Sequence, residues 1–276
     1  MLKTYGIIGI ILIILVEINF FLKIEPFASW YFPIVWLGYI LVVDALVYRI
    51  RKKSLLSNKP LMFIGLFILS AIFWYFFEIL NFSIQNWRYV GVEKIRIGTI
   101  KTIYKFLAFS TVLPALFETT ELIRSIHIFD KIKLKKKFNI TKNFLYITIF
   151  LGIICFFLPL VIPNFAFPLV WLSFFLILDP INYLNKQPSI IGHIKNKKLA
   201  VPLSLLLAGI VLGFFWEFWN YWAIPKWTYE IPFVGFFKIF EMPILGYFGY
   251  FPFAFELYAM YWFARSLFIP VEKILD

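Results

Sequence analysis

The feature of this sequence that most constrains its fold is a series of apolar segments, each long enough to cross a membrane. An α-helix needs roughly 20 mainly apolar residues to span the hydrocarbon core of a bilayer. Eight segments meet this requirement, at residues 5–22, 30–50, 61–82, 104–124, 143–162, 167–184, 200–222 and 243–264. Because 62% of the residues are hydrophobic and only 15% are charged, a single soluble core cannot hide the apolar surface. We therefore predict an all-α, polytopic membrane protein with about eight transmembrane helices.

The basic residues are distributed unevenly among the connections between these segments. If the N-terminus is cytoplasmic, 19 of the 27 Lys and Arg residues fall in inner segments and 8 in outer segments. Membrane proteins carry such an excess on the cytoplasmic side. We predict a multi-pass protein of the cell (inner) membrane with both termini cytoplasmic. The net charge of +12 then reflects orientation in the membrane rather than nucleic-acid binding.

An internal repeat with a period near 138 residues is the most informative pattern in the chain. Residues 32–37 and Asp44 match residues 167–172 and Asp179, and Pro114 matches Pro252. The other matches, in chain order, pair Glu78 with Glu217, Asn81 with Asn220, Trp87-Arg88-Tyr89 with Trp227-Thr228-Tyr229, and Glu118 with Glu256. We predict two tandem four-helix repeats, residues 1–130 and 131–276. Each has an even number of spans, so the two repeats should be parallel. The first spans of the two copies show no convincing match.

Eight acidic residues lie within the predicted spans, and six of them form repeat-matched pairs. A carboxylate inside a membrane is energetically costly and is by default a functional candidate. A carboxyl group buried without a cation is generally protonated, and it can then donate its proton to a substrate. The catalytic candidates are Glu217, Glu256, Glu78 and Glu118. Asp44 and Asp179 lie near the basic connections and are predicted to be structural, as is Glu17, with local contacts.

Polar and aromatic residues near these carboxyl groups are candidates for substrate binding. They are Asn220, Asn81, Trp216, Trp219, Trp227, Tyr229, Trp87 and Tyr89. Each Asn lies three residues after a Glu, on the same helix face, where its amide can hold the carboxyl group or share a substrate contact. Aromatic rings suit cations through their π faces. Alternatively, all of these residue types also hold membrane bundles together.

The connections 83–103 and 223–242 mix aromatic residues with isolated charges. We predict that they form interfacial or re-entrant helices that cover a cavity open to the outer leaflet. The second copy contains more Pro and Gly interruptions, so we expect the principal site there.

Metal and cofactor chemistry is not indicated. The chain has one Cys, which lies inside an apolar segment, and two His, both in predicted loops. It has no nucleotide-binding fingerprint and no zinc-hydrolase motif. We therefore predict no metal site and no cofactor.

The arrangement Trp227-x-Tyr229, followed by Pro252-x-x-x-Glu256 at the start of an aromatic helix, resembles the integral-membrane lycopene cyclase and carotenoid hydratase families. The likeness covers about residues 214–262 and, more faintly, 74–122. The cyclases read Pro-x-Glu-Glu at this helix start, whereas this chain has a single Glu four residues after the Pro. The resemblance implies protonation of a polyene or polyprenoid by Glu217 or Glu256, with Glu78 and Glu118 as their counterparts.

Three functions are consistent with these patterns. The first is a membrane enzyme that acts on an apolar lipid, polyprenoid or carotenoid-like, by cofactor-free acid–base chemistry; a cyclase, isomerase or hydratase would fit. The second is a small-molecule or proton-coupled transporter that uses the same carboxylates. The third is a non-catalytic membrane scaffold subunit. The expected partner is a membrane lipid or an apolar small molecule, and an oligomer or a membrane complex is left open.

Overall fold

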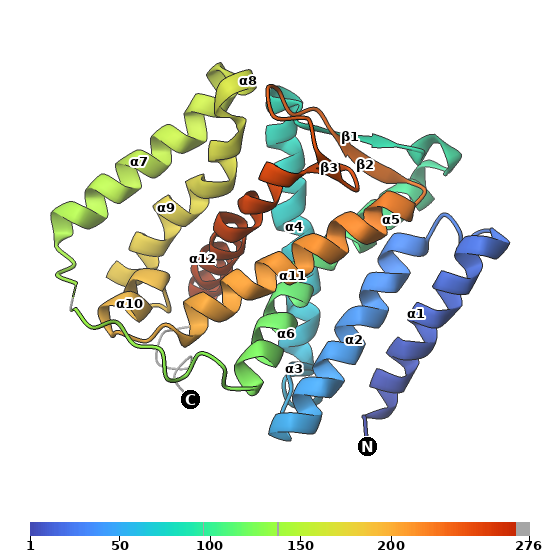
Figure 1. Cartoon of the computed structure of the whole chain (residues 1–276), viewed down its shortest axis with the longest axis horizontal. Helices are drawn as coiled ribbons and strands as arrows, with labels where there is room; N and C mark the ends of the chain where they lie inside the picture. Colours follow the sequence, from blue (N-terminus) through green and yellow to red (C-terminus); the bar gives the residue numbers. More distant parts are fainter. Residues whose placement is uncertain (96, 137, 269–276) are drawn as a thin grey trace. The chain divides into compact units, whose positions relative to one another are not determined.

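The computed structural model describes residues 1–95, 97–136 and 138–268, and in this part the chain is predominantly helical (Figure 1). The α-helices are α1 (Thr4–Leu22), α2 (Tyr31–Arg51), α3 (Leu55–Asn58), α4 (Pro60–Ile84), α5 (Gly98–Ser110), α6 (Val112–Ser125), α7 (Lys142–Val161), α8 (Pro163–Ala166), α9 (Val170–Leu184), α10 (Ile190–Lys195), α11 (Ala200–Trp222) and α12 (Tyr250–Phe268). The 3₁₀ helices are η1 (Val92–Lys94), η2 (Phe167–Leu169) and η3 (Ile244–Gly249), and the strands are β1 (Trp87–Val90), β2 (Lys226–Tyr229), β3 (Lys238–Ile239) and β4 (Met242–Pro243).

Seven helical segments in the described residues are long and apolar enough to cross a membrane. They are Thr4–Leu22, Tyr31–Arg51, Pro60–Ile84, Gly98–Ser125, Lys142–Val161, Pro163–Leu184 and Ala200–Trp222. The all-helical, multi-pass class predicted from the sequence is therefore confirmed. The eighth predicted span, 243–264, starts at the end of β4 and continues through the 3₁₀ helix η3, and α12 begins only at Tyr250. Because α12 is not among the seven, the count of eight stays a prediction.

The helices gather into two compact units. Unit 1 comprises Met1–Ile126 and Val211–Ile244, and unit 2 comprises His127–Ile210 and Leu245–Asp276. Helix α11 contributes its first half to unit 2 and its second half to unit 1. The units describe packing, whereas the predicted repeats 1–130 and 131–276 describe sequence similarity, and that boundary stays a prediction.

Glycines bring the first helix of each copy close to its neighbour. In unit 1, a Cβ atom on Gly38 of α2 would lie 2.8 Å from Ile13 Cγ1 and 2.9 Å from the Gly9 carbonyl oxygen of α1. In unit 2, a Cβ atom on Gly152 of α7 would lie 2.7 Å from Ile177 Cγ1 of α9. Small residues let membrane helices approach closely where no hydrophobic effect drives association. The first span of each copy therefore packs closely on the second span of the same copy through glycine, although the first spans show no sequence match to each other.

Replacing Gly38 by Leu is expected to force α1 away from α2 and to lower the thermal unfolding midpoint in detergent. Overpacking of this kind destabilises by about 1–3 kcal/mol. Gly65 of α4 is the matched control, because a Cβ atom there meets no heavy atom within 4 Å. Gly65→Leu should be neutral or slightly stabilising, since Leu is a better helix former than Gly. Equal midpoints for the two variants would contradict the close packing.

The predicted span 104–124 is two helices, α5 and α6, that meet at Thr111. The Ser70 hydroxyl of α4 fills the break: it donates to the Phe109 carbonyl at 2.7 Å and accepts the Leu113 N–H at 3.0 Å. Pro114 follows at once and cannot donate the hydrogen bond that a continuous helix requires. In the second copy, Gly209 occupies the position of Ser70, and a Cβ atom there would lie 2.6 Å from the Tyr250 carbonyl oxygen.

The two repeat-matched Trp-x-Tyr segments are strands that pair with each other in unit 1 (Figure 1). Trp87 lies opposite Tyr229, Arg88 opposite Thr228 and Tyr89 opposite Trp227. This register is symmetric about Arg88 and Thr228, as a two-fold relation between the two loops would produce. The prediction of interfacial or re-entrant helices is wrong here, because alternating aromatic residues favour extended backbone and antiparallel pairing.

Candidate functional site

The two matched asparagines anchor the paired strands to the helices before them. The Asn220 amide donates to the Trp227 carbonyl at 2.8 Å, and its oxygen accepts the Trp227 N–H at 2.8 Å. Asn81 donates to the Trp87 carbonyl at 2.8 Å and accepts the N–H groups of Asn86 and Trp87. The two amide side chains, which were candidates for substrate binding, therefore form hydrogen bonds with the backbone N–H and carbonyl groups of the strands. A buried backbone group without a partner is costly, so this role is structural.

Glu78 and Glu217 hold the side chains of the same strands. Glu78 Oε1 accepts hydrogen bonds from Trp87 Nε1 at 2.9 Å and from the Tyr89 hydroxyl at 2.7 Å. Glu217 Oε1 accepts the Tyr229 hydroxyl at 2.7 Å, and Trp227 Nε1 donates to that hydroxyl at 2.7 Å. Burial, together with the nearby Glu78, raises the pKa of Tyr89 well above its ordinary value, so its hydroxyl stays a donor.

Asp44 and Asp179 each fix the start of a short helix that follows their own span. Asp44 accepts the Leu56 N–H at 2.9 Å at the start of α3. Asp179 accepts the N–H groups of Ile190 and Ile191 at 2.6 and 2.9 Å at the start of α10. Carboxylates favour helix N-termini, where backbone N–H groups lack intrahelical partners. These contacts are of the structural kind that the sequence predicts.

Glu118 and Glu256 differ from the other matched carboxyl groups, because they hold neither a strand side chain nor the start of a helix. Each also has a buried oxygen with no hydrogen-bond partner in the described part of the chain. That atom is Oε1 in Glu118 and Oε2 in Glu256. Glu256 is fully buried, and its other oxygen accepts the Phe174 N–H of α9 at 2.9 Å. Glu118 is 2% exposed and interacts with Asp44 through its side chain. Such unsatisfied buried atoms are rare and demand an explanation.

Trp216 and Trp219, two of the candidate substrate contacts, fill the interior of unit 1. Their ring centroids lie 5.6 and 4.9 Å from that of Trp36, and Trp227 packs on Phe32 at 5.2 Å. Trp219 Nε1 also donates to Glu17 at 3.2 Å, and Tyr31 donates to the same Glu17 oxygen at 2.9 Å. The prediction that Glu17 makes only local contacts is therefore wrong.

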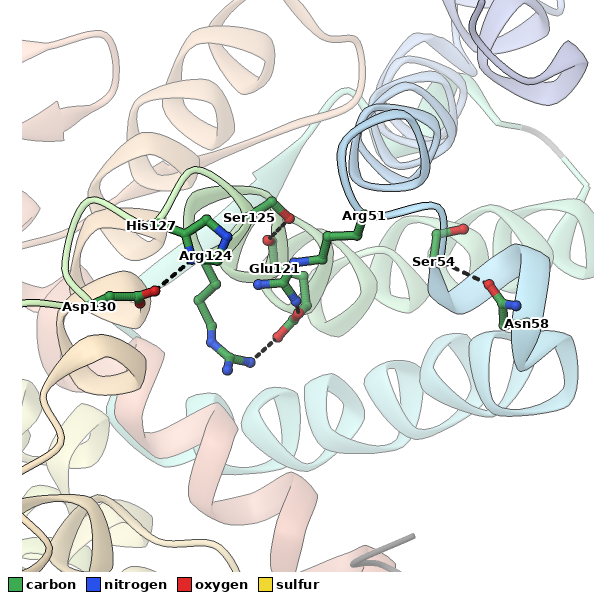
Figure 2. A network of polar contacts seen from close by, with 8 residues as sticks. All are labelled: Arg51, Ser54, Asn58, Glu121, Arg124, Ser125, His127 and Asp130. Carbon is green, nitrogen blue, oxygen red and sulfur yellow. Dashed lines mark hydrogen bonds and ion pairs between the residues drawn. The ribbon is translucent and has the colours of Figure 1, made fainter.

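Glu121, which has no counterpart in the second copy, lies between two arginines (Figure 2). Arg51 and Arg124 each approach one of its carboxyl oxygens to 2.5 Å. The side chains of all three are 30–37% exposed, so their ion pairs contribute little to stability. Ala259 occupies the matching position, so the two copies differ at this end.

The predicted catalytic residues belong to both units. Unit 1 holds Glu78, Glu118 and Glu217, whereas Glu256 belongs to unit 2. The prediction that the principal site lies in the second copy stays a prediction. Sequence reasoning did not single out Tyr5, Ser54 or Ser70, because hydroxyl groups in or beside apolar helices carry no signal without a partner.

Comparison with known proteins gives no further assignment. No protein-family model, curated protein or solved structure matches this chain significantly.

Proposed function

We propose that this protein is a membrane-embedded enzyme that acts on an apolar lipid of the polyprenoid or carotenoid type by acid–base chemistry without a cofactor. Glu118 and Glu256 are the proposed proton-transfer groups. The observation that carries this proposal is that these two matched carboxyl groups are buried, each with one oxygen that lacks a hydrogen-bond partner in the described residues, and hold neither a strand nor a helix start. The other four matched carboxyl groups make contacts that hold strands or helix starts.

The surroundings of Glu256 support chemistry on an electron-rich hydrocarbon. Two aromatic pairs join α9 and α12 just before Glu256 in sequence: Trp171 with Phe253, and Phe175 with Phe255, both at 5.3 Å between centroids. A protonated carboxyl group can donate its proton to a carbon–carbon double bond, and the cation that forms is stabilised by π faces. Loss of a proton from a neighbouring carbon to the carboxylate then restores the acid and gives an isomerised or cyclised product.

The resemblance of the Trp-x-Tyr and Pro-x-x-x-Glu segments to lycopene cyclases and carotenoid hydratases points to the same substrate class. In this proposal Glu78 and Glu217 position the paired strands, and Asn81 and Asn220 anchor them. Trp216 and Trp219 form the aromatic interior of unit 1.

We place the protein in the cell (inner) membrane with both termini cytoplasmic. The distribution of Lys and Arg over the connections supports this orientation. It puts Arg51 and Arg124 at the cytoplasmic boundary.

A non-catalytic membrane subunit is the second candidate function. It is favoured by the contacts of Asp44, Asp179, Glu78 and Glu217, because each of these carboxyl groups holds a segment of the chain in place.

Native mass spectrometry combined with lipid analysis, on protein purified gently from its own membranes, tests the proposed substrate class. We expect a single isoprenoid or carotenoid to co-purify, because a buried apolar site should retain its ligand through mild extraction. Recovery of bulk phospholipid alone would favour a carrier, and a stoichiometric protein partner would favour the scaffold subunit.

A further inference from the structure

A chain of hydrogen-bonded hydroxyl groups runs from the surface of unit 1 to Asp44. The Ser57 hydroxyl is exposed, beyond the basic end of α2, and lies 3.0 Å from the Tyr5 hydroxyl. Tyr5 donates to Asp44 Oδ1 at 2.6 Å, and the Ser54 hydroxyl donates to the same oxygen at 2.7 Å. Asp44 itself is fully buried. Three hydroxyl groups therefore connect a buried carboxyl group to the end of the bundle that carries Arg51.

The same chain continues from Asp44 to Glu118. The two side chains interact directly, across the contact between α2 and α6. The Tyr39 hydroxyl, 2.8 Å from Thr119 Oγ1, ties the two helices together close by. Glu121 also faces Glu118, but it is held in ion pairs with Arg51 and Arg124. Beyond Asp44, the chain ends at the Glu118 carboxyl group.

In the described part of the second copy, no chain of hydroxyl groups leads to Asp179. Asp179 accepts its two hydrogen bonds from the backbone N–H groups of Ile190 and Ile191. The Ser189 hydroxyl, which corresponds to Ser54, accepts the Gly192 N–H instead. Glu256 accepts the Phe174 N–H and interacts with the Ser173 hydroxyl, but Ser173 is fully buried and donates to the Val170 carbonyl, so it does not lead to the surface. A peptide N–H is too weak an acid to pass its proton on, whereas hydroxyl and carboxyl groups relay protons readily.

We propose that these side chains form a proton path to Glu118, which we call the Asp44 path. It consists of Ser57, Tyr5, Ser54 and Asp44. In each transfer Asp44 gives one proton to Glu118 and regains one from Tyr5 or Ser54. Tyr5 is reprotonated from Ser57 and water, and Ser54, whose hydroxyl lies 3.4 Å from that of Tyr5, is reprotonated through Tyr5. The net change is one proton moved from water to Glu118. The path rests on the proposed function, because it recharges a proton-transfer group of that function. The Asp44 path implies that Glu118, the acid of the first copy, exchanges its proton with water at the end of the bundle that carries Arg51.

Infrared spectroscopy of the full-length protein in lipid vesicles tests the Asp44 path without any substrate. The carboxyl bands of Glu118 and Glu256 are assigned by their loss in Glu118→Gln and Glu256→Gln. Transfer into deuterated buffer then gives an exchange rate for each band. We expect Glu118 to exchange faster than Glu256. The double variant Tyr5→Phe/Ser54→Gly should slow Glu118 exchange by about tenfold, the loss expected for hydrogen bonds to a charged group.

Two features of this design separate the path from folding effects. Gly at the helix N-cap retains most of the stability that Ser provides, so Ser54→Gly preserves α3. Tyr48→Phe is the matched control, because Tyr48 contacts Lys3 near the same end of the bundle and lies outside the path. It should leave the Glu118 rate unchanged.

The proposal is overturned by an unchanged Glu118 rate in the double variant, by equal rates for Glu118 and Glu256, or by the absence of a protonated Glu118 band. Failure of the proposed enzyme function gives a different result. In that case Glu118 exchanges through the path as expected, but the lipid product is unaffected by Glu118→Gln/Glu256→Gln.

Discussion

Replacing both Glu118 and Glu256 by Gln is expected to reduce formation of the lipid product by about 10²- to 10⁴-fold, the range typical of general acid–base groups. Gln matches Glu in size, and its oxygen can still accept the Phe174 N–H, but it cannot act as a carboxylic acid. The variant should therefore remain folded, as judged by its elution profile and thermal midpoint. The product is measured in extracts of cells that carry only the variant gene.

Single variants show which copy performs the chemistry. If both acids are used, Glu118→Gln and Glu256→Gln each lower product formation; if one copy is vestigial, only one of them does. Glu121→Gln is the matched control, because Glu121 is partly exposed and paired with arginines. It should leave product formation unchanged. Wild-type product levels in the double variant would contradict the assignment of both groups.

Replacing Asn220 by Ala is expected to have the second largest effect, a loss of about 2–4 kcal/mol in the free energy of unfolding. The substitution leaves the N–H and the carbonyl of Trp227 without partners, and each unpaired buried group costs roughly 1–3 kcal/mol. Asn220 itself is fully buried, so water cannot easily take its place. Unfolding in mixed detergent micelles measures the change.

Two further variants calibrate this effect. Asn81→Ala removes the equivalent bonds to β1, but Asn81 is only half-buried, so a smaller loss is expected. Asn164→Ala, at an exposed position in α8, should have almost no effect. If Asn220→Ala were as stable as Asn164→Ala, the anchoring of β2 by Asn220 would be ruled out.

The helices were predictable from the sequence because hydropathy over about 20 residues is a local property. Helix α11 spans 200–222 as predicted. The start of α1 and both ends of α2 differ from their predicted bounds by a single residue. The break between α5 and α6 was missed, because it depends on the Ser70 hydroxyl from a different helix. Helix α12 starts at Tyr250 instead of residue 243, because the 3₁₀ helix η3 occupies residues 244–249.

The pairing of β1 with β2 was not predictable, because it joins two four-residue segments about 140 residues apart. The internal repeat identified which residues of the two copies correspond, but not which residues they contact. Asn220 and Glu217 lie on one helix face, yet one binds strand backbone and the other binds a Tyr hydroxyl. Only these contacts separate Glu118 and Glu256 from the other matched carboxyl groups.

Comparing the lipids of cells with and without the gene tests the central claim most directly. Enzyme action on an apolar lipid predicts that deletion removes one isoprenoid or carotenoid product and accumulates its precursor. The wild-type gene should restore the product, and the Glu118→Gln/Glu256→Gln gene should not. Identical isoprenoid and carotenoid profiles in all of these strains would contradict the account.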